Sequence, residues 1–133
     1  LAAVYHDSTE IITGDMPTPI KYYNSEIKSA YKQIESAAGD SLINMLPEDF
    51  KEDFKPIFSP DPETKRLVKA ADKLSALIKC IEELKMGNRE FEVAEKTISE
   101  GIKKLNCPEA DIFIEEFIPS FYLSLDEQKE EQQ

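Results

Sequence analysis

The chain has 133 residues and a formal net charge of −11, with 41% hydrophobic and 32% charged side chains. These proportions are typical of one globular domain in water and exclude a disordered chain. The negative charge repels nucleic-acid backbones and anionic membranes, and no apolar run approaches the roughly 18–20 residues that span a bilayer. We therefore expect neither a nucleic-acid polymer nor a membrane as a partner.

The charge does not exclude a small anionic ligand, because a bound cation can reverse the local field. The two cysteines, Cys80 and Cys107, lack CxxC spacing. Two such thiols in a chain of this size predict reduced residues and a cytoplasmic setting.

Helical periodicity runs through nearly every segment, which predicts an all-α fold without strands. The first helix should span residues 1–12 and end at Gly14, where a residue without Cβ can adopt the left-handed cap conformation. Residues 15–19 contain two prolines and predict a rigid extended loop. A second helix should begin near Asn24 or Ser25. Its expected buried face consists of Ile27, Ala30, Tyr31, Ile34, Ala38, Leu42, Met45 and Leu46.

Prolines and glycines delimit the remaining helices. Pro47 suits the first turn of a short helix that carries Phe50 and Phe54. A long helix should span residues 62–86, capped by Asp61 and closed by Gly87. Its apolar stripe is Leu67, Ala71, Leu74, Ile78 and Ile81. Another helix should cover 91–105, and a last one should open at residue 108, with core or dimer-surface residues Phe113, Phe117 and Phe121. Residues 1–125 should form the domain, and 126–133 an acidic frayed tail.

His6 and Asp7 are the first candidates for chemistry. A divalent cation can bind one imidazole nitrogen and one carboxylate oxygen from such a pair. Glu10 would share a helical face with His6 and could hold or deprotonate a water there. A lone histidine is more often structural or exposed than a ligand, so the dipeptide alone favours that alternative.

Three further acidic and basic positions are less specific. Asp15 stands between a glycine and two prolines that fix the backbone, although ordinary loop capping is an alternative. Asp72 lies off the apolar stripe near lysines, so periodicity alone indicates a solvated residue. Lys21 is expected on the surface, with a phosphate contact as the alternative. Tyr22 and Tyr23 are expected to pack under the loop, with stacking on a nucleotide base as the alternative.

Three stretches resemble the bacterial 5′-deoxynucleotidases of the HD-domain superfamily, the YfbR-like enzymes. Residues 6–24 read HDSTEIITGDMPTPIKYYN and match the extended pattern HD…E…GD.PTP.KY of that family. Residues 67–84 are similar to the helix that carries the last metal ligand of the family, and residues 117–127 are similar to its C-terminal end. Together the matches cover most of the chain in the expected order.

The resemblance implies an all-helical HD-domain bundle that removes phosphate from deoxyribonucleoside 5′-monophosphates through a metal-activated water. It also implies a divalent transition metal such as Co or Mn, and a homodimer. Carried over by position, His6, Asp7 and Asp72 would be metal ligands. Glu10 would be the catalytic residue that acts on the attacking water or the leaving group, and Asp15 would accept a hydrogen bond from the 3′-hydroxyl of the sugar.

The sequence departs from the family in one respect. The family takes another histidine ligand, with Arg and Trp residues for the nucleotide, from upstream of the HD pair. Here His6 is the only histidine, tryptophan is absent, and the chain starts at Leu1 without a capping residue. We therefore expect an N-terminal segment to be missing. An HD phosphohydrolase of another nucleotide or phosphate ester, and a non-catalytic helical interaction module on the HD scaffold, remain as alternatives.

Overall fold

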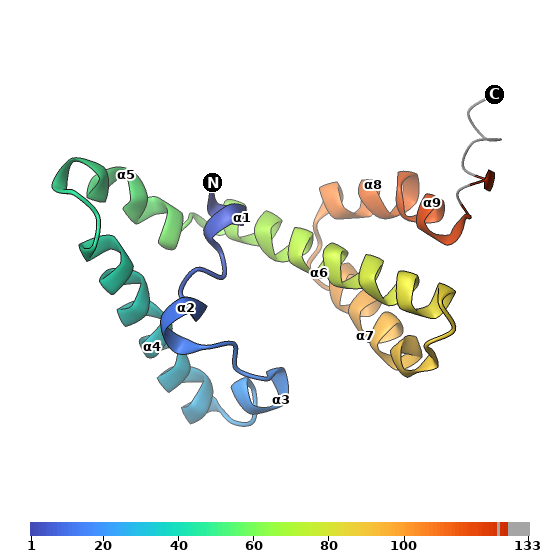
Figure 1. Ribbon diagram of the computed structural model, residues 1–133, viewed down its shortest axis with the longest axis horizontal. Coiled ribbons are helices and arrows are strands. Elements are labelled where there is room, and N and C mark those ends of the chain that lie inside the picture. The colour runs from blue at the N-terminus through green and yellow to red at the C-terminus, as the bar shows by residue number, and fades with distance from the viewer. Residues whose placement is uncertain (125, 128–133) are drawn as a thin grey trace. The chain divides into compact units, whose positions relative to one another are not determined.

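The computed structural model describes residues 1–124, 126 and 127, and the chain divides into two compact units, Leu1–Asp61 and Pro62–Gln133. All regular structure in the described residues is helical (Figure 1), which confirms the predicted all-α class. No helix within the described part is long and apolar enough to cross a membrane. Of the expected acidic tail, residues 128–133 lie outside the described residues.

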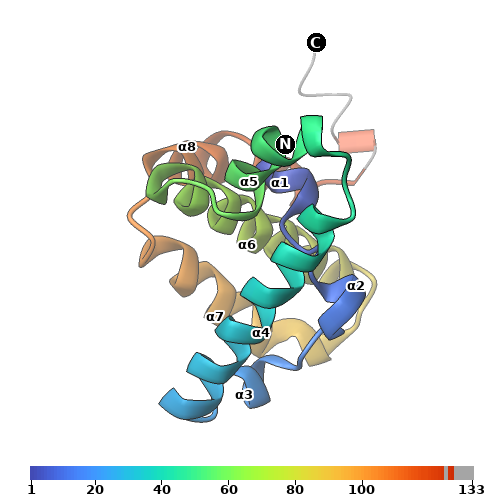
Figure 2. The same cartoon turned by 90° about the vertical axis from the view of Figure 1, so that its left-hand side faces the viewer.

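The first unit is built around one long helix. Its elements are α1 (Ala2–Tyr5), α2 (Glu10–Thr13), α3 (Thr18–Lys21), α4 (Ser25–Asn44) and α5 (Glu48–Phe58). The helix α4 begins at Ser25, as the sequence predicts, and the side chain of Asn24 caps it by accepting a hydrogen bond of 2.8 Å from the Ile27 amide. The short helices α2 and α3 lie against α4 (Figure 2). At the other end of the unit, Tyr5 of α1 packs edge-to-face on Phe54 of α5.

The prediction of one continuous helix over residues 1–12 is wrong, because residues 6–9 form turns between α1 and α2. In this segment the amides of Ser8 and Glu10 bond to carbonyls three residues back, and the Ser8 hydroxyl donates to the Tyr5 carbonyl at 2.6 Å. Short polar side chains such as that of Ser8 compete with helical bonding in this way. His6 and Glu10 therefore do not share the face of one regular helix.

The predicted buried face of α4 is correct only in part. Its buried residues are Tyr31, Ala38, Gly39 and Ile43, whereas Ile34 and Met45 are 52% and 73% exposed. The reason is that only short helices and α5 cover α4 within this unit, so the covered strip is narrow. A Cβ atom at Gly39 would lie 3.6 Å from the Phe58 ring and 3.8 Å from the Thr9 methyl group.

The second unit is organised around the long helix α6 (Pro62–Lys85). It continues with η1 (Arg89–Phe91), α7 (Glu92–Lys103), α8 (Pro108–Glu116) and α9 (Ile118–Tyr122), which all contact α6. Its core consists of Ala70, Leu74, Leu77, Ile81, Ile102, Cys107, Ala110 and Ile118. The predicted stripe of α6 is confirmed at Leu74 and Ile81, but Ala71 is exposed. The neighbouring positions Ala70 and Leu77 are buried instead, because helices pack on more than one side of α6.

The last predicted helix is two helices with a break at Phe117. Pro119 explains the break, since proline has no amide hydrogen and its ring clashes with the carbonyl of the preceding turn. Phe113 and Phe121 pack against the core, whereas Phe117 is exposed. Both cysteines are buried free thiols, which confirms the predicted absence of a disulfide.

Candidate functional site

His6 and Asp7 are brought together at the end of α1. The Nδ1 atom of His6 lies 2.8 Å from the carbonyl oxygen of Ala3, and its Nε2 atom lies 3.1 Å from Oδ2 of Asp7. A neutral imidazole that donates from Nδ1 to Ala3 keeps the lone pair of Nε2 facing the carboxylate. A hydrogen bond from the second ring nitrogen to a carbonyl is also what orients histidines that bind metals.

The spacing of this pair can be compared with the chemistry of a metal site. Two ligand atoms that each lie about 2.1 Å from a first-row cation, about 90° apart, are separated by about 3.0 Å. The Nε2 to Oδ2 distance in His6 and Asp7 is 3.1 Å. The donor set therefore fits two neighbouring ligands of one divalent cation. A protonated imidazole would instead form an ordinary ion pair with the same carboxylate.

Glu10, the first residue of α2, is half-buried and lies within the electrostatic reach of these groups. Its pKa is raised, first by loss of solvent and then by the negative charges of Asp7 and Asp15, while Lys21 acts in the opposite direction. A raised pKa makes a carboxylate a stronger base, which suits it to accept and return a proton. Two other predicted site residues of this unit, Asp7 and Asp15, thus lie near enough to act on the charge of Glu10.

Asp15 follows directly after a residue with a special backbone conformation. Gly14 has φ 69° and ψ 161°, so the predicted positive φ is confirmed, although ψ is extended rather than that of the left-handed helix. Only glycine adopts this region readily. Pro17 precedes α3, and Pro19 stands in its first turn. The predicted extended loop therefore ends at Pro17, two residues earlier than expected.

Lys21 is not the ordinary surface lysine that the sequence indicates. Its Nζ atom lies 2.7 Å from Oε1 of Glu35 and 4.5 Å from the centre of the Tyr31 ring, and its side chain is only 27% exposed. Tyr22 and Tyr23 are exposed, so the prediction that they pack under the loop is wrong. Tyr31 packs against the loop instead. Its position in the predicted buried face of α4 is the feature of the sequence that could have indicated this packing.

Asp72 is an exposed residue of α6 and belongs to the second unit. In the described parts of the chain, no group of three or more His, Cys, Asp and Glu side chains is gathered as a metal site. The structure thus brings together His6 and Asp7, with Glu10 and Asp15 in electrostatic reach. The role of Asp72 stays a prediction.

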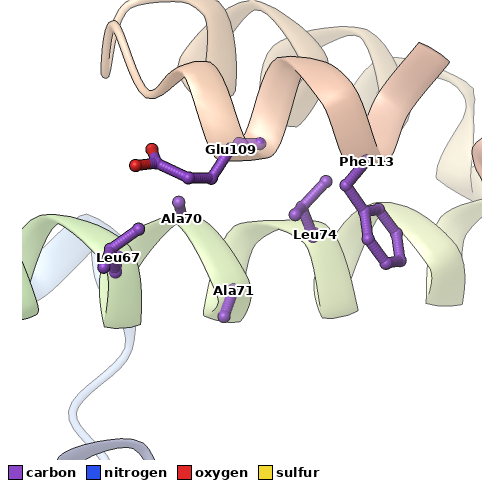
Figure 3. A pocket seen from close by; sticks show the side chains of 7 residues that line it. Leu67, Ala70, Ala71, Leu74, Glu109 and Phe113 are labelled. Atoms are coloured by element: carbon purple, nitrogen blue, oxygen red, sulfur yellow. The ribbon is translucent and has the colours of Figure 1, made fainter. Parts of the chain in front are cut away.

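A pocket in the second unit lies between α6 and α8 (Figure 3), and its mostly apolar lining differs in chemistry from the site residues described above. Its lining consists of Leu67, Ala70, Ala71, Leu74, Glu109, Ala110 and Phe113. Small alanine side chains of α6 leave this gap, and its one charged group is a carboxylate that pairs with Arg66 at 3.4 Å. Such a lining offers no donor to a phosphate, so the pocket is not a candidate nucleotide site.

Comparison with known proteins bears on the site as a whole. The model of the family described as "5′-deoxynucleotidase YfbR-like" matches residues 1–121. A 5′-deoxynucleotidase of Vibrio parahaemolyticus is 50% identical over 130 residues, which are 96% of this chain and 67% of that protein. A 5′-deoxynucleotidase of Vibrio cholerae is 45% identical, with the same shares covered. The 5′-deoxynucleotidase YfbR of Escherichia coli is 46% identical over 96% of this chain and 65% of its own length. The chain thus spans about two thirds of the length of these relatives.

Proposed function

The chain belongs to the YfbR-like 5′-deoxynucleotidase family, and on this premise we propose that the protein is a metal-dependent phosphohydrolase that removes phosphate from deoxyribonucleoside 5′-monophosphates. The observation that carries the proposal is the contact of 3.1 Å between Nε2 of His6 and Oδ2 of Asp7, with the other ring nitrogen fixed by a backbone carbonyl. We assign the activity to an HD-type domain over residues 1–125.

The proposed metal ligands are His6, Asp7 and Asp72. The first two are supported by their geometry, and Asp72 by its position in the stretch that resembles the ligand-bearing helix of the family. We propose a divalent transition cation such as Co²⁺ or Mn²⁺, since imidazole and carboxylate together suit such ions. When bound, the cation polarises the phosphoryl oxygens and lowers the pKa of a neighbouring water.

Glu10 and Asp15 would serve the substrate directly. The carboxylate of Glu10 would accept a proton from the attacking water or deliver one to the leaving nucleoside oxygen, and its raised pKa supports this role. The carboxylate of Asp15 would accept a hydrogen bond from the 3′-hydroxyl of the sugar. Its exposure at the end of the Gly14 turn leaves it accessible to a ligand.

Two further properties belong to the same proposal. We propose a homodimer, which is supported by the large aromatic side chains of Phe117 and Tyr122, both exposed in the second unit. We also propose a cytoplasmic setting, which the two free cysteines support. The net charge of −11 argues that the substrate is a small nucleotide and not a polymer.

The experiment measures release of inorganic phosphate from 2′-deoxyadenosine 5′-monophosphate by the intact protein. Activity should disappear after chelation and return when Co²⁺ or Mn²⁺ is added. His6→Ala and Asp72→Ala should each lower kcat/KM by at least about 100-fold, because a lost metal ligand removes several kcal/mol of transition-state stabilisation.

Asp111→Ala is the matched control for Asp72→Ala. Asp111 is an exposed aspartate of the same unit that has no proposed role, so its substitution should leave the rate unchanged. Stoichiometric metal should be measurable in the wild-type protein and lost in His6→Ala. Full activity in His6→Ala or Asp72→Ala, or hydrolysis that survives chelation, would contradict the proposal.

A further inference from the structure

The loop that carries Asp15 is attached to α4 at both of its ends. At the first end, the buried Tyr31 donates a hydrogen bond of 3.4 Å from its hydroxyl to the carbonyl oxygen of Gly14. The Thr13 hydroxyl donates to the same oxygen at 2.9 Å. The carbonyl immediately before Asp15 is therefore held from two sides.

At the second end of the loop, Lys21 attaches α3 to the same helix. Its Nζ atom donates to Oε1 of Glu35 at 2.7 Å and lies 4.5 Å from the centre of the Tyr31 ring. Both partners of this ion pair are about two-thirds covered. Burial acts to lower the pKa of Lys21, but the hydrogen bond and the charge of Glu35 outweigh it, so the pKa is raised and the pair stays ionised.

Tyr31 and Glu35 are four residues apart on α4, so they project from one face of the helix. One helical turn thus holds the start and the end of the loop over residues 14–21. Within the described residues, no hydrogen bond or ion pair holds the carboxylate of Asp15. The region that this carboxylate can reach is therefore set by the backbone of the loop, and the backbone is held by these contacts.

We propose that Tyr31, Lys21 and Glu35 form a loop clamp, a set of positioning residues that place the Asp15 carboxylate for the sugar of the substrate. This inference rests on the proposed function, in which Asp15 receives the 3′-hydroxyl. The loop clamp does not touch the substrate, and it determines specificity through the backbone of the loop. A shift of about 1 Å in such a group is enough to cost on the order of 100-fold in rate.

The test compares two substrates that differ only in the hydroxyl at issue, a 2′-deoxyribonucleoside 5′-monophosphate and the corresponding 2′,3′-dideoxyribonucleotide. Lys21→Met and Tyr31→Phe should each lower kcat/KM for the deoxyribonucleotide at least about tenfold and leave the dideoxyribonucleotide nearly unaffected. The ratio of kcat/KM for the deoxyribonucleotide to kcat/KM for the dideoxyribonucleotide should thus approach the ratio found in Asp15→Ala. Lys21→Arg keeps the charge and should restore part of the preference.

Lys32→Met provides the matched control, because Lys32 is an exposed lysine of α4 and directly follows Tyr31 in the sequence. It changes the net charge by the same amount as Lys21→Met and should leave the preference for the deoxyribonucleotide unchanged. A purely structural role would lower the rates with both substrates by the same factor. An unchanged preference in both Lys21→Met and Tyr31→Phe would overturn the loop clamp.

A second measurement separates this proposal from the proposed function. Hydrogen–deuterium exchange of the peptide over residues 10–23 should become at least about tenfold faster in Lys21→Met and Tyr31→Phe, while peptides of the second unit keep their rates. If the wild-type protein hydrolyses neither nucleotide, the proposed function fails. The exchange data would then still decide whether the loop clamp holds the loop, and unchanged exchange would refute it.

Discussion

Ile81 is the residue whose truncation should cost the second unit most. It is 0% exposed and belongs to the core cluster, in the last turns of α6. Ile81→Ala removes three buried carbon atoms, which at about 0.8 kcal/mol each gives about 2.4 kcal/mol of lost transfer free energy. The cavity that remains adds a further penalty, so the free energy of unfolding should fall by about 3–5 kcal/mol.

Urea unfolding followed by circular dichroism measures this loss. With a slope of about 1.5 kcal/mol per molar urea, a loss of 3 kcal/mol lowers the midpoint by about 2 M. If the alanine variant does not fold, Ile81→Val removes one carbon atom and should cost about 0.5–1.5 kcal/mol.

Ile112→Ala is the control, since Ile112 is an isoleucine of α8 in the same unit that is 54% exposed. Its truncation should change the free energy of unfolding by less than about 0.5 kcal/mol. Equal losses in Ile81→Ala and Ile112→Ala would refute the assignment of the core and the packing of α6 derived from it.

Three further predictions concern the site and the last helix. Gly14→Ala should cost about 1–3 kcal/mol in urea unfolding, because φ 69° with ψ 161° strains any residue with a Cβ; a cost near zero would contradict this backbone. Glu10 has a raised pKa, so its contribution to stability falls as pH rises above 4.5. In chelator, Glu10→Gln should therefore raise the free energy of unfolding slightly at pH 7, by less than about 1 kcal/mol, and not at pH 3; the reverse pattern would be evidence against the shift. Burial and the hydrogen bond to Glu95 raise the pKa of Tyr122 to about 12, so ultraviolet titration should show one late tyrosine that is missing in Tyr122→Phe.

Much of the helical architecture could be predicted because its determinants are local. Asn24 caps α4, Pro62 opens α6, and Gly87 with φ 87° closes it, each through the conformational preferences of a single residue. The buried faces were predicted less well. Ile34 of α4 and Ala71 of α6 have helical periodicity but are exposed, because burial depends on which helices pack alongside.

The candidate site was predictable as a set of residues but not as an arrangement. The motif of residues 6–24 identifies His6, Asp7 and Glu10, yet the regular helix assumed for them is interrupted by turns. Polar side chains in that segment bond to the backbone, and helical periodicity does not register such competition. The contacts of Lys21 were missed for a related reason: Glu35 is 14 residues away, and no local pattern links the two.

Gly39 offers a practical route for separating folding from chemistry. It lies inside α4, where glycine costs about 0.5–1 kcal/mol relative to alanine, and a Cβ there would make ordinary contacts with Phe58 and Thr9. Gly39→Ala should therefore reinforce the junction of α4, the end of α5 and the turn that follows His6 and Asp7. In this reinforced background, a variant that is inactive because it unfolds should recover activity, whereas one that lacks a reacting group should not.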